Sequence, residues 1–176
     1  MKFLRNTVVA ILICALVVVG STFFSVRRNL QPLADDVTDR FFAGNGIADS
    51  LKSLCDSAEG LAGIAESYGL DTSTLVSLSA HLRQDLKKRD LSEIYDLYQE
   101  LSSELRRCEA QLSRETLSAE DGAESEHWLA LAAQSQEKIG DSDYNARVAR
   151  FFRDDLNVFS GFMARLCGVK LPSAFA

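Results

Sequence analysis

Hydrophobic and polar positions divide the chain into one continuous apolar run and a longer region where apolar residues recur at helical spacing. The run extends from Thr7 to Phe24 without a charged residue, and basic residues flank it on both sides. In lipid, backbone polar groups must be satisfied within their own segment, so such a run is stable there as a helix. A helix of this length spans about 27 Å, close to the thickness of the bilayer hydrocarbon. The pattern predicts a transmembrane helix over residues 7–25, after a short basic N-terminus over residues 1–6.

A cleaved secretory signal is the alternative interpretation of the same run. Lys2 and Arg5 would then form its positive region, and Val18-Val19-Gly20 would be the cleavage site. The apolar stretch continues past that site to a basic stop at Arg27 and Arg28, which favours an uncleaved single-pass anchor. Because basic residues stand at both ends of the run, the positive-inside rule leaves the side of the membrane unassigned.

Beyond the run, apolar residues recur every three or four positions, which is typical of helices that bury one face. The near-heptad step over residues 94–112 favours long helices packed side by side. Gly44-Asn45-Gly46 should break the chain, and the polar stretch Ser118–Ser125, centred on Gly122, should be a loop. We therefore expect an all-α protein, with an N-terminal transmembrane helix followed by an antiparallel bundle of long helices over residues 26–168. A flexible tail over residues 169–176 should follow.

The last helix of this bundle, near residues 142–167, has apolar residues on two adjoining faces. A face this wide should be buried against several helices, so we expect this helix to be the central element of the bundle. Asp141 or Ser142 can cap it. Asp155 lies on one of the faces, and we expect it at an edge with access to water. The apolar positions are Tyr144, Val148, Phe151, Val158 and Phe162 on one face and Phe152, Leu156, Phe159 and Met163 on the other.

The charge balance limits the classes of partner. All 25 acidic residues lie beyond the apolar run, whereas only 17 of the 19 basic residues do, so that region has a net charge near −8. Such a balance argues against nucleic acid as a partner and against a polybasic contact with anionic lipid headgroups.

Two sets of residues carry a resemblance to a known family. The set in the last helix is Tyr144-Asn145, Val148, Phe151, Ala164, Leu166, Gly168 and Lys170, and a weaker set is Leu51-Lys52, Asp56, Leu61 and Tyr68. At these positions the chain resembles the LemA family of bacterial membrane-anchored helical proteins. It departs from the family's C-terminal pattern at Phe152, Phe159 and Val169.

This resemblance implies an all-α domain of long antiparallel helices on a single anchor, without an enzymatic role to transfer to particular residues. We expect Tyr144, Asn145, Phe151 and Phe159 to set the bundle. Tyr144 can bury its ring while its hydroxyl reaches a partner. Asn145 is a poor interior helix residue, so an interhelical hydrogen bond or a capping role is expected for it.

No catalytic, cofactor-binding or metal-binding residue is predicted. The chain contains two histidines, His81 and His127. Glu124 and His127 have the Glu-x-x-His spacing of di-iron bundles, but that chemistry needs a second copy, and Leu78 stands three residues before His81. We therefore interpret Glu124 and His127 as a solvated helix start and expect the protein not to be an enzyme.

The four cysteines form no C-x-x-C pair. Cys14 lies within the apolar run, and Cys55, Cys108 and Cys167 occupy apolar helix positions, where cysteine behaves as a small hydrophobe. The spacing leaves a disulfide among the last three open.

Together these features predict a single-pass membrane protein that acts as a scaffold or adaptor for an unidentified protein partner, without a cofactor and without nucleic acid. The near-heptad stripes also allow self-association into a homo-oligomer. Two alternatives stay open, an extracytoplasmic sensor-like protein that signals through a separate subunit and a secreted helical binding protein.

Overall fold

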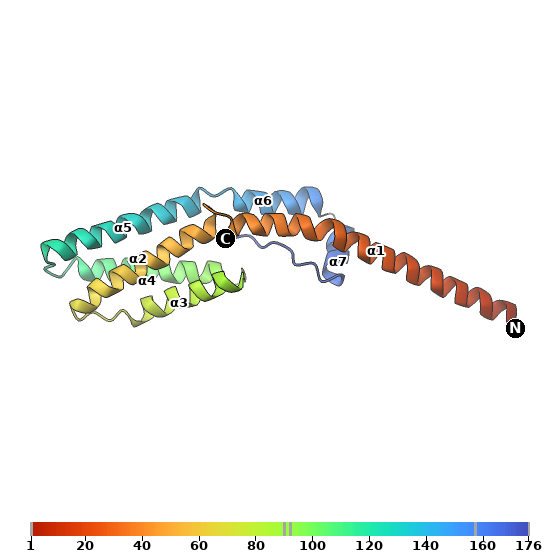
Figure 1. Cartoon of the computed structure of the whole chain (residues 1–176), viewed down its shortest axis with the longest axis horizontal. Helices are drawn as coiled ribbons and strands as arrows, with labels where there is room; N and C mark the ends of the chain where they lie inside the picture. Colours follow the sequence, from red (N-terminus) through yellow and green to blue (C-terminus); the bar gives the residue numbers. More distant parts are fainter. Residues whose placement is uncertain (1, 90, 92, 157, 176) are drawn as a thin grey trace. The chain divides into compact units, whose positions relative to one another are not determined.

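The computed structural model describes residues 2–89, 91, 93–156 and 158–175. These residues form an all-α protein, and no strand occurs among them. The helices are α1 (Lys2–Phe42), α2 (Ile47–Ser67), α3 (Ser73–Lys88), α4 (Ile94–Leu112), α5 (Ala119–Gly140), α6 (Tyr144–Arg150), the short π-helix η1 (Phe151–Asp155) and α7 (Val158–Leu166) (Figure 1).

The chain forms two compact units. Unit 1 consists of residues 1–39 and 146–172, and unit 2 consists of residues 40–145 and 173–176. Helix α1 therefore begins in unit 1 and ends in unit 2, and the chain returns to unit 2 for its last four residues. The expectation of a single bundle domain over residues 26–168 differs from this division, because residues 26–39 and 146–168 belong to unit 1 and residues 40–145 to unit 2.

Unit 2 contains the antiparallel bundle. Helix α2 packs against α3, α4 and α5, and the four helices run in alternating directions (Figure 1). The apolar stripe of α2 is almost wholly buried, with Leu51, Leu54 and Leu61 fully enclosed. The prediction that the last helix is the central element is wrong, because α2 occupies the centre of the bundle and residues 146–172 belong to unit 1.

Two turns of unit 2, at Asn45 and Gly69, contain a residue with a positive φ angle. Asn45 has a φ of 66°, and it lies between the end of α1 and the start of α2, as the Gly-Asn-Gly stretch predicted. Gly69 has a φ of 76° and ends α2. The carboxylate of Asp71 then accepts a hydrogen bond from the backbone nitrogen of Ser73, at 3.0 Å, where α3 begins.

The expected loop over residues 118–125 is a helix start instead. The Ser118 hydroxyl accepts a hydrogen bond from the backbone nitrogen of Asp121, at 3.1 Å, so that Ser118 is the N-cap of α5. Glu120 and Asp121 lie in the first turn, where the helix dipole favours acidic side chains. These two effects outweigh the cost of Gly122 within the helix, which is about 1 kcal/mol relative to alanine.

Tyr68 connects the end of α2 to the start of α5. Its hydroxyl donates to the Asp121 carboxylate at 2.7 Å and accepts from the backbone nitrogen of Ser118 at 2.9 Å. Hydrogen bonds from Ser118 and Tyr68 lower the pKa of Asp121 below its usual value. This cluster fixes one end of the contact between α2 and α5.

The middle of the same contact depends on a glycine. A Cβ atom at Gly60 on α2 would lie 2.3 Å from the Trp128 ring on α5, so the indole occupies the space where a side chain would be. A Cβ atom at Gly63, one turn further along α2, would meet nothing within 4 Å. The two helices therefore approach closely at Gly60, and Trp128 fills the junction.

Unit 1 contains the first part of α1 and the broken C-terminal helix. The helix expected near residues 142–167 is divided into α6, η1 and α7, with an extended residue at Leu156. Its buried cluster pairs Leu30 and Ala34 of α1 with Phe151, Ala164, Cys167 and Val169. Phe152 and Phe162, which were expected to be buried, are 40% and 63% exposed. Asp155 is exposed, as the sequence predicted.

The close approach at Gly60 leads to a test of the α2–α5 contact. We expect Gly60→Ala to lower the free energy of unfolding by about 1–3 kcal/mol, because the new methyl group must displace the Trp128 ring. Gly63→Ala is the matched control, and it should raise the same quantity by up to about 1 kcal/mol through helix propensity. Urea unfolding followed by circular dichroism measures both. Equal effects of the two substitutions would contradict the close contact.

Candidate functional site

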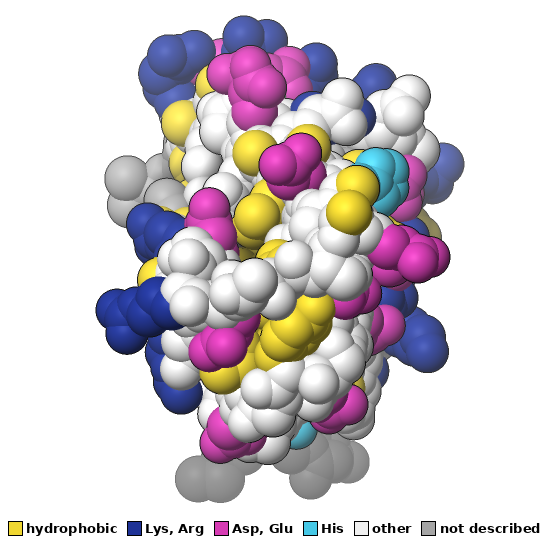
Figure 2. All heavy atoms as spheres, turned by 90° about the vertical axis from the view of Figure 1, so that its left-hand side faces the viewer, with side chains coloured by type: hydrophobic (Ala, Val, Ile, Leu, Met, Phe, Trp, Pro, Cys, Tyr) yellow, Lys and Arg dark blue, Asp and Glu magenta, His cyan; other side chains and the backbone are white. Residues whose placement is uncertain are grey.

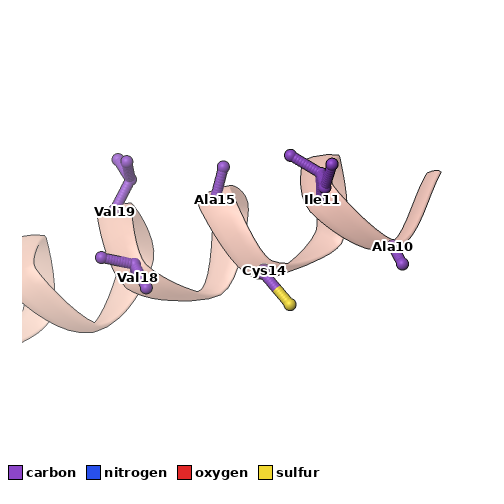
Figure 3. Close-up of a pocket in the computed structure, with 6 residues that line it drawn as sticks. All are labelled: Ala10, Ile11, Cys14, Ala15, Val18 and Val19. Carbon is purple, nitrogen blue, oxygen red and sulfur yellow. The ribbon is translucent and has the colours of Figure 1, made fainter. Parts of the chain in front are cut away.

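The apolar surface of α1 is the first candidate site. Seven side chains between Val9 and Val19 are 49–71% exposed, and the apolar stretch to which they belong has no buried residue among those described. A shallow depression on this surface is lined by six side chains of the one helix (Figure 3). Its lining residues are Ala10, Ile11, Cys14, Ala15, Val18 and Val19.

Exposure of these side chains to water is unfavourable. Full burial of a Val, Leu or Ile side chain stabilises a protein by about 1.5–3 kcal/mol, and none of that gain is realised along this stretch. By length and composition, α1 is long and apolar enough to cross a membrane, as a signal sequence near the N-terminus also is. This surface is therefore stable only in apolar surroundings.

A second candidate site lies in unit 2, where the C-terminal tail packs into an aromatic cluster. Phe175 is 8% exposed, and its ring centroid lies 5.2–5.6 Å from those of Phe41, Tyr95 and Tyr98. The ring of Tyr144 meets Phe41 edge-on at 5.2 Å. Aromatic pairs at these separations contribute about 0.5–1.5 kcal/mol beyond the area that they bury.

Asn145 and Tyr144 hold the backbone of this tail. The Asn145 amide nitrogen donates to the Phe175 carbonyl, and the Asn145 amide oxygen accepts from the Phe175 nitrogen, both at 2.7 Å. The Tyr144 hydroxyl donates to the carbonyl of Ser173 at 3.0 Å, and burial raises the pKa of Tyr144 to about 12. Hydrogen bonds to main-chain atoms select an extended segment, and the aromatic rings select the side chain of Phe175.

This arrangement differs from the expectation of a flexible tail over residues 169–176. Val169, Pro172 and Phe175 are all buried, and Asn145 bonds to the tail instead of to another helix. The Ser142 hydroxyl accepts a hydrogen bond from the backbone nitrogen of Tyr144, at 3.3 Å, where α6 begins. Sequence reasoning missed Phe175, whose only signal was a large aromatic residue near the chain end.

The four residues expected to set one bundle are divided between the units. Tyr144 and Asn145 lie in unit 2, and Phe151 is 2% exposed within the cluster of unit 1. The Phe159 side chain lies outside the described part of the structure. The structure therefore brings the Tyr-Asn pair to the tail and gives Phe151 a separate packing role.

Glu124, His127 and His81 lie at the surface of the protein. Glu124 accepts a hydrogen bond from the Trp128 indole nitrogen at 3.2 Å, and His127 and His81 are exposed. Among the described residues, no group of three or more His, Cys, Asp or Glu side chains is placed to hold a metal ion. The expectation that the protein is not an enzyme stays a prediction.

The four cysteines are free thiols. Cys55, Cys108 and Cys167 are buried, and Cys167 donates to the backbone carbonyl of Phe23 at 3.8 Å. Burial raises the pKa of Cys55 to about 12 and also raises the pKa of Cys108. A thiol must be ionised to act as a nucleophile or metal ligand, so these two side chains are suited to packing.

Comparison of the chain with protein-family models, with curated proteins and with solved structures found no match. The resemblance to the LemA family therefore stays a prediction. It rests on the Tyr144-Asn145 pair and the residues that follow it.

The tail site is tested through Asn145. We expect Asn145→Asp to release the tail, because a carboxylate oxygen would replace the amide donor that faces the Phe175 carbonyl. A lost hydrogen bond of this kind costs about 1–3 kcal/mol, so hydrogen exchange at the Phe175 amide should accelerate by about tenfold or more. Ser173→Ala is the control, since the Ser173 side chain is exposed and its carbonyl is retained. Unchanged exchange in Asn145→Asp would contradict the docking described here.

The thiol arrangement is tested by alkylation of the native chain. We expect Cys55 and Cys108 to resist iodoacetamide at pH 8 and to react fully after unfolding in urea, because burial disfavours their thiolates. Peptide mass spectrometry identifies the modified positions. Rapid native labelling of Cys55, or a disulfide-linked peptide from the unreduced protein, would contradict the assignment.

Proposed function

We propose that this protein is a membrane-anchored, non-enzymatic scaffold or adaptor of the LemA type, with α1 as its single anchor and unit 2 as the part that meets protein partners. The exposed apolar surface of α1 carries the proposal. A helix of this composition is stable in lipid because it satisfies its own backbone hydrogen bonds and presents apolar side chains all round. Side chains exposed between Val9 and Val19 then gain the apolar surroundings that the protein itself does not provide.

The charge of unit 2 indicates the kind of partner. Unit 2 contains ten basic and twenty acidic residues, a net charge of −10. Figure 2 looks onto the end of unit 2 that carries the α2–α3 and α4–α5 turns, where charged side chains are spread widely and apolar ones form small separate patches. Such a surface favours a basic protein partner and repels nucleic acid.

The most distinctive residues of the sequence have structural roles, and this supports a non-catalytic function. Tyr144 and Asn145, which carry most of the resemblance to the LemA family, hold the chain terminus by hydrogen bonds. Burial raises the pKa of the Cys55 thiol, and among the described residues no group of three or more His, Cys, Asp or Glu side chains is placed to hold a metal ion. Unit 2 is accordingly interpreted as a rigid helical body whose surface is presented near a membrane.

The anchor is tested by a charge placed on α1. We expect Leu16→Arg with Val17→Arg to move the chain from the carbonate-resistant membrane fraction to the soluble fraction. Each arginine at the centre of a spanning helix costs about 2.5–3.5 kcal/mol. Leu33→Arg is the matched control, because Leu33 is also exposed but lies beyond the apolar run. It should leave the chain in the membrane fraction.

Protease treatment of spheroplasts in the same experiment decides the side of the membrane and the alternatives. A C-terminal tag that is digested places unit 2 outside the cytoplasm and favours an envelope scaffold or a sensor-like protein. A protected tag places unit 2 in the cytoplasm. A shortened chain in the medium would overturn the anchor and favour a secreted helical binding protein.

A further inference from the structure

Helix α7 packs beside α1 where the apolar run ends. Ala164 and Cys167 are buried against α1 in a cluster that contains Leu30 and Ala34. The Cys167 sulfur lies 3.8 Å from the backbone carbonyl oxygen of Phe23, one residue before the end of the run. Helix α7 is therefore positioned at the boundary between the apolar and polar parts of α1.

Helix α7 has a defined C-terminal end and runs across the direction of α1. Gly168 has a φ of 65°, and the Val169 nitrogen donates to the Ala164 carbonyl at 2.9 Å, which closes the helix in a Schellman motif. Figure 1 shows α7 lying across the direction of α1 rather than parallel to it. If α1 crosses a membrane, a helix with this orientation lies along the membrane surface.

The face of α7 that points away from α1 is apolar and exposed. Phe162 and Leu166 are four residues apart and share one face, and they are 63% and 61% exposed. Ala164 lies two residues from each of them, about 200° around the helix, and it is fully buried. Helix α7 thus buries Ala164 against α1 and leaves Phe162 and Leu166 uncovered by the described residues.

Exposed basic residues occur on α7, directly after it and on the neighbouring part of α1. Arg165 and Lys170 are exposed on the α7 side, and Arg27 and Arg28 are exposed on α1 just after the run. Acidic residues of α1 begin only at Asp35, about 10 Å further along the helix. Unit 1 as a whole contains nine basic and five acidic residues, a net charge of +4 against −10 for unit 2.

We propose that α7 is an interfacial helix, which rests on the membrane surface beside the end of the α1 span and inserts Phe162 and Leu166 into the lipid. This inference depends on the proposed function, because it takes α1 as a membrane anchor. Arg165 and Lys170 then lie at the level of the lipid phosphates, where basic side chains are favoured. An apolar helix face with basic neighbours, continuous with a spanning segment, fits a bilayer surface with anionic lipid.

The depth of Phe162 in the bilayer tests the proposal. The purified full-length chain is reconstituted into phosphatidylcholine–phosphatidylglycerol vesicles whose acyl chains carry bromine either near the headgroups or near the bilayer centre. Phe162→Trp, Val17→Trp and Val76→Trp are compared, and quenching of Trp128 in the unsubstituted chain is subtracted. Val17 is exposed on the apolar run, whereas Val76 is exposed on α3 of the acidic unit 2.

We expect the tryptophan at position 162 to lose most of its emission to bromine near the headgroups, because an interfacial helix lies about 5–10 Å into the headgroup and acyl boundary. The tryptophan at position 17 should be quenched most by bromine near the bilayer centre, and the one at position 76 should not be quenched. Quenching at position 17 without quenching at position 162 would overturn the interfacial helix while the anchor stands. Absence of quenching at position 17 would overturn the anchor, and quenching at position 76 would overturn the specific role of α7.

A second variant guards against a local disturbance by the new indole. Leu166→Trp lies on the same face, and it should reproduce the depth measured at position 162. If a second copy of this chain or a protein partner covers the face instead, both tryptophans shift to shorter emission wavelength but are not quenched by bromine. That result would overturn the lipid contact.

Discussion

The apolar surface of α1 has to be kept out of water, and much of the structure can be understood from that constraint. Nothing in the described part of the protein covers the described side chains from Val9 to Val19, although the same helix buries Leu30, Ala34 and Phe41 further along. One continuous helix therefore joins a segment that requires apolar surroundings to segments stabilised by their own tertiary contacts. Unit 1 contains the junction between the apolar segment of α1 and the segment packed against the rest of the protein. The first buried residue of its cluster, Leu30, follows the basic pair Arg27 and Arg28.

The two units carry net charges of opposite sign, and the basic unit is the one that contains the apolar surface of α1. The net charge of −6 for the chain is the result of a basic unit 1 and a strongly acidic unit 2. Averaged along the sequence, the excess of acidic residues argued against contact with anionic lipid headgroups. The fold reverses that argument locally, because it brings Arg165 and Lys170 into the same unit as Arg27 and Arg28. The acidic unit 2 can then attract a basic partner over a long range, while the basic unit 1 can contact a membrane surface.

Unit 2 is stabilised by contacts in which one small or polar residue determines a long-range arrangement. Gly60 allows Trp128 to fill the junction between α2 and α5, and Tyr68 ties the end of α2 to the cap of α5. Asn145 plays the corresponding role for the chain terminus, since its amide satisfies both backbone groups of Phe175. Substitution of Tyr68 or Asn145 leaves a polar group without its partner, and a larger residue at Gly60 meets the Trp128 ring. Such residues therefore affect stability more than their size indicates.

The amino-acid sequence by itself determined the all-α class, the apolar helix at the N-terminus, the break at Gly44-Asn45-Gly46 and the helix over residues 94–112. These features follow from local periodicity and backbone preference. The sequence did not determine that α5 begins at Ala119, where the Ser118 cap and the acidic first turn outweigh the polar, glycine-containing composition. Only the tertiary structure decided that the last helix breaks at Leu156, that α2 is the centre of the bundle and that Phe175 is buried. Helical periodicity shows which residues share a face, but the neighbour that covers a face is set by contacts between residues far apart in the chain. For Phe162 and Leu166 the described residues provide no such neighbour, and their exposure came to light only with the fold.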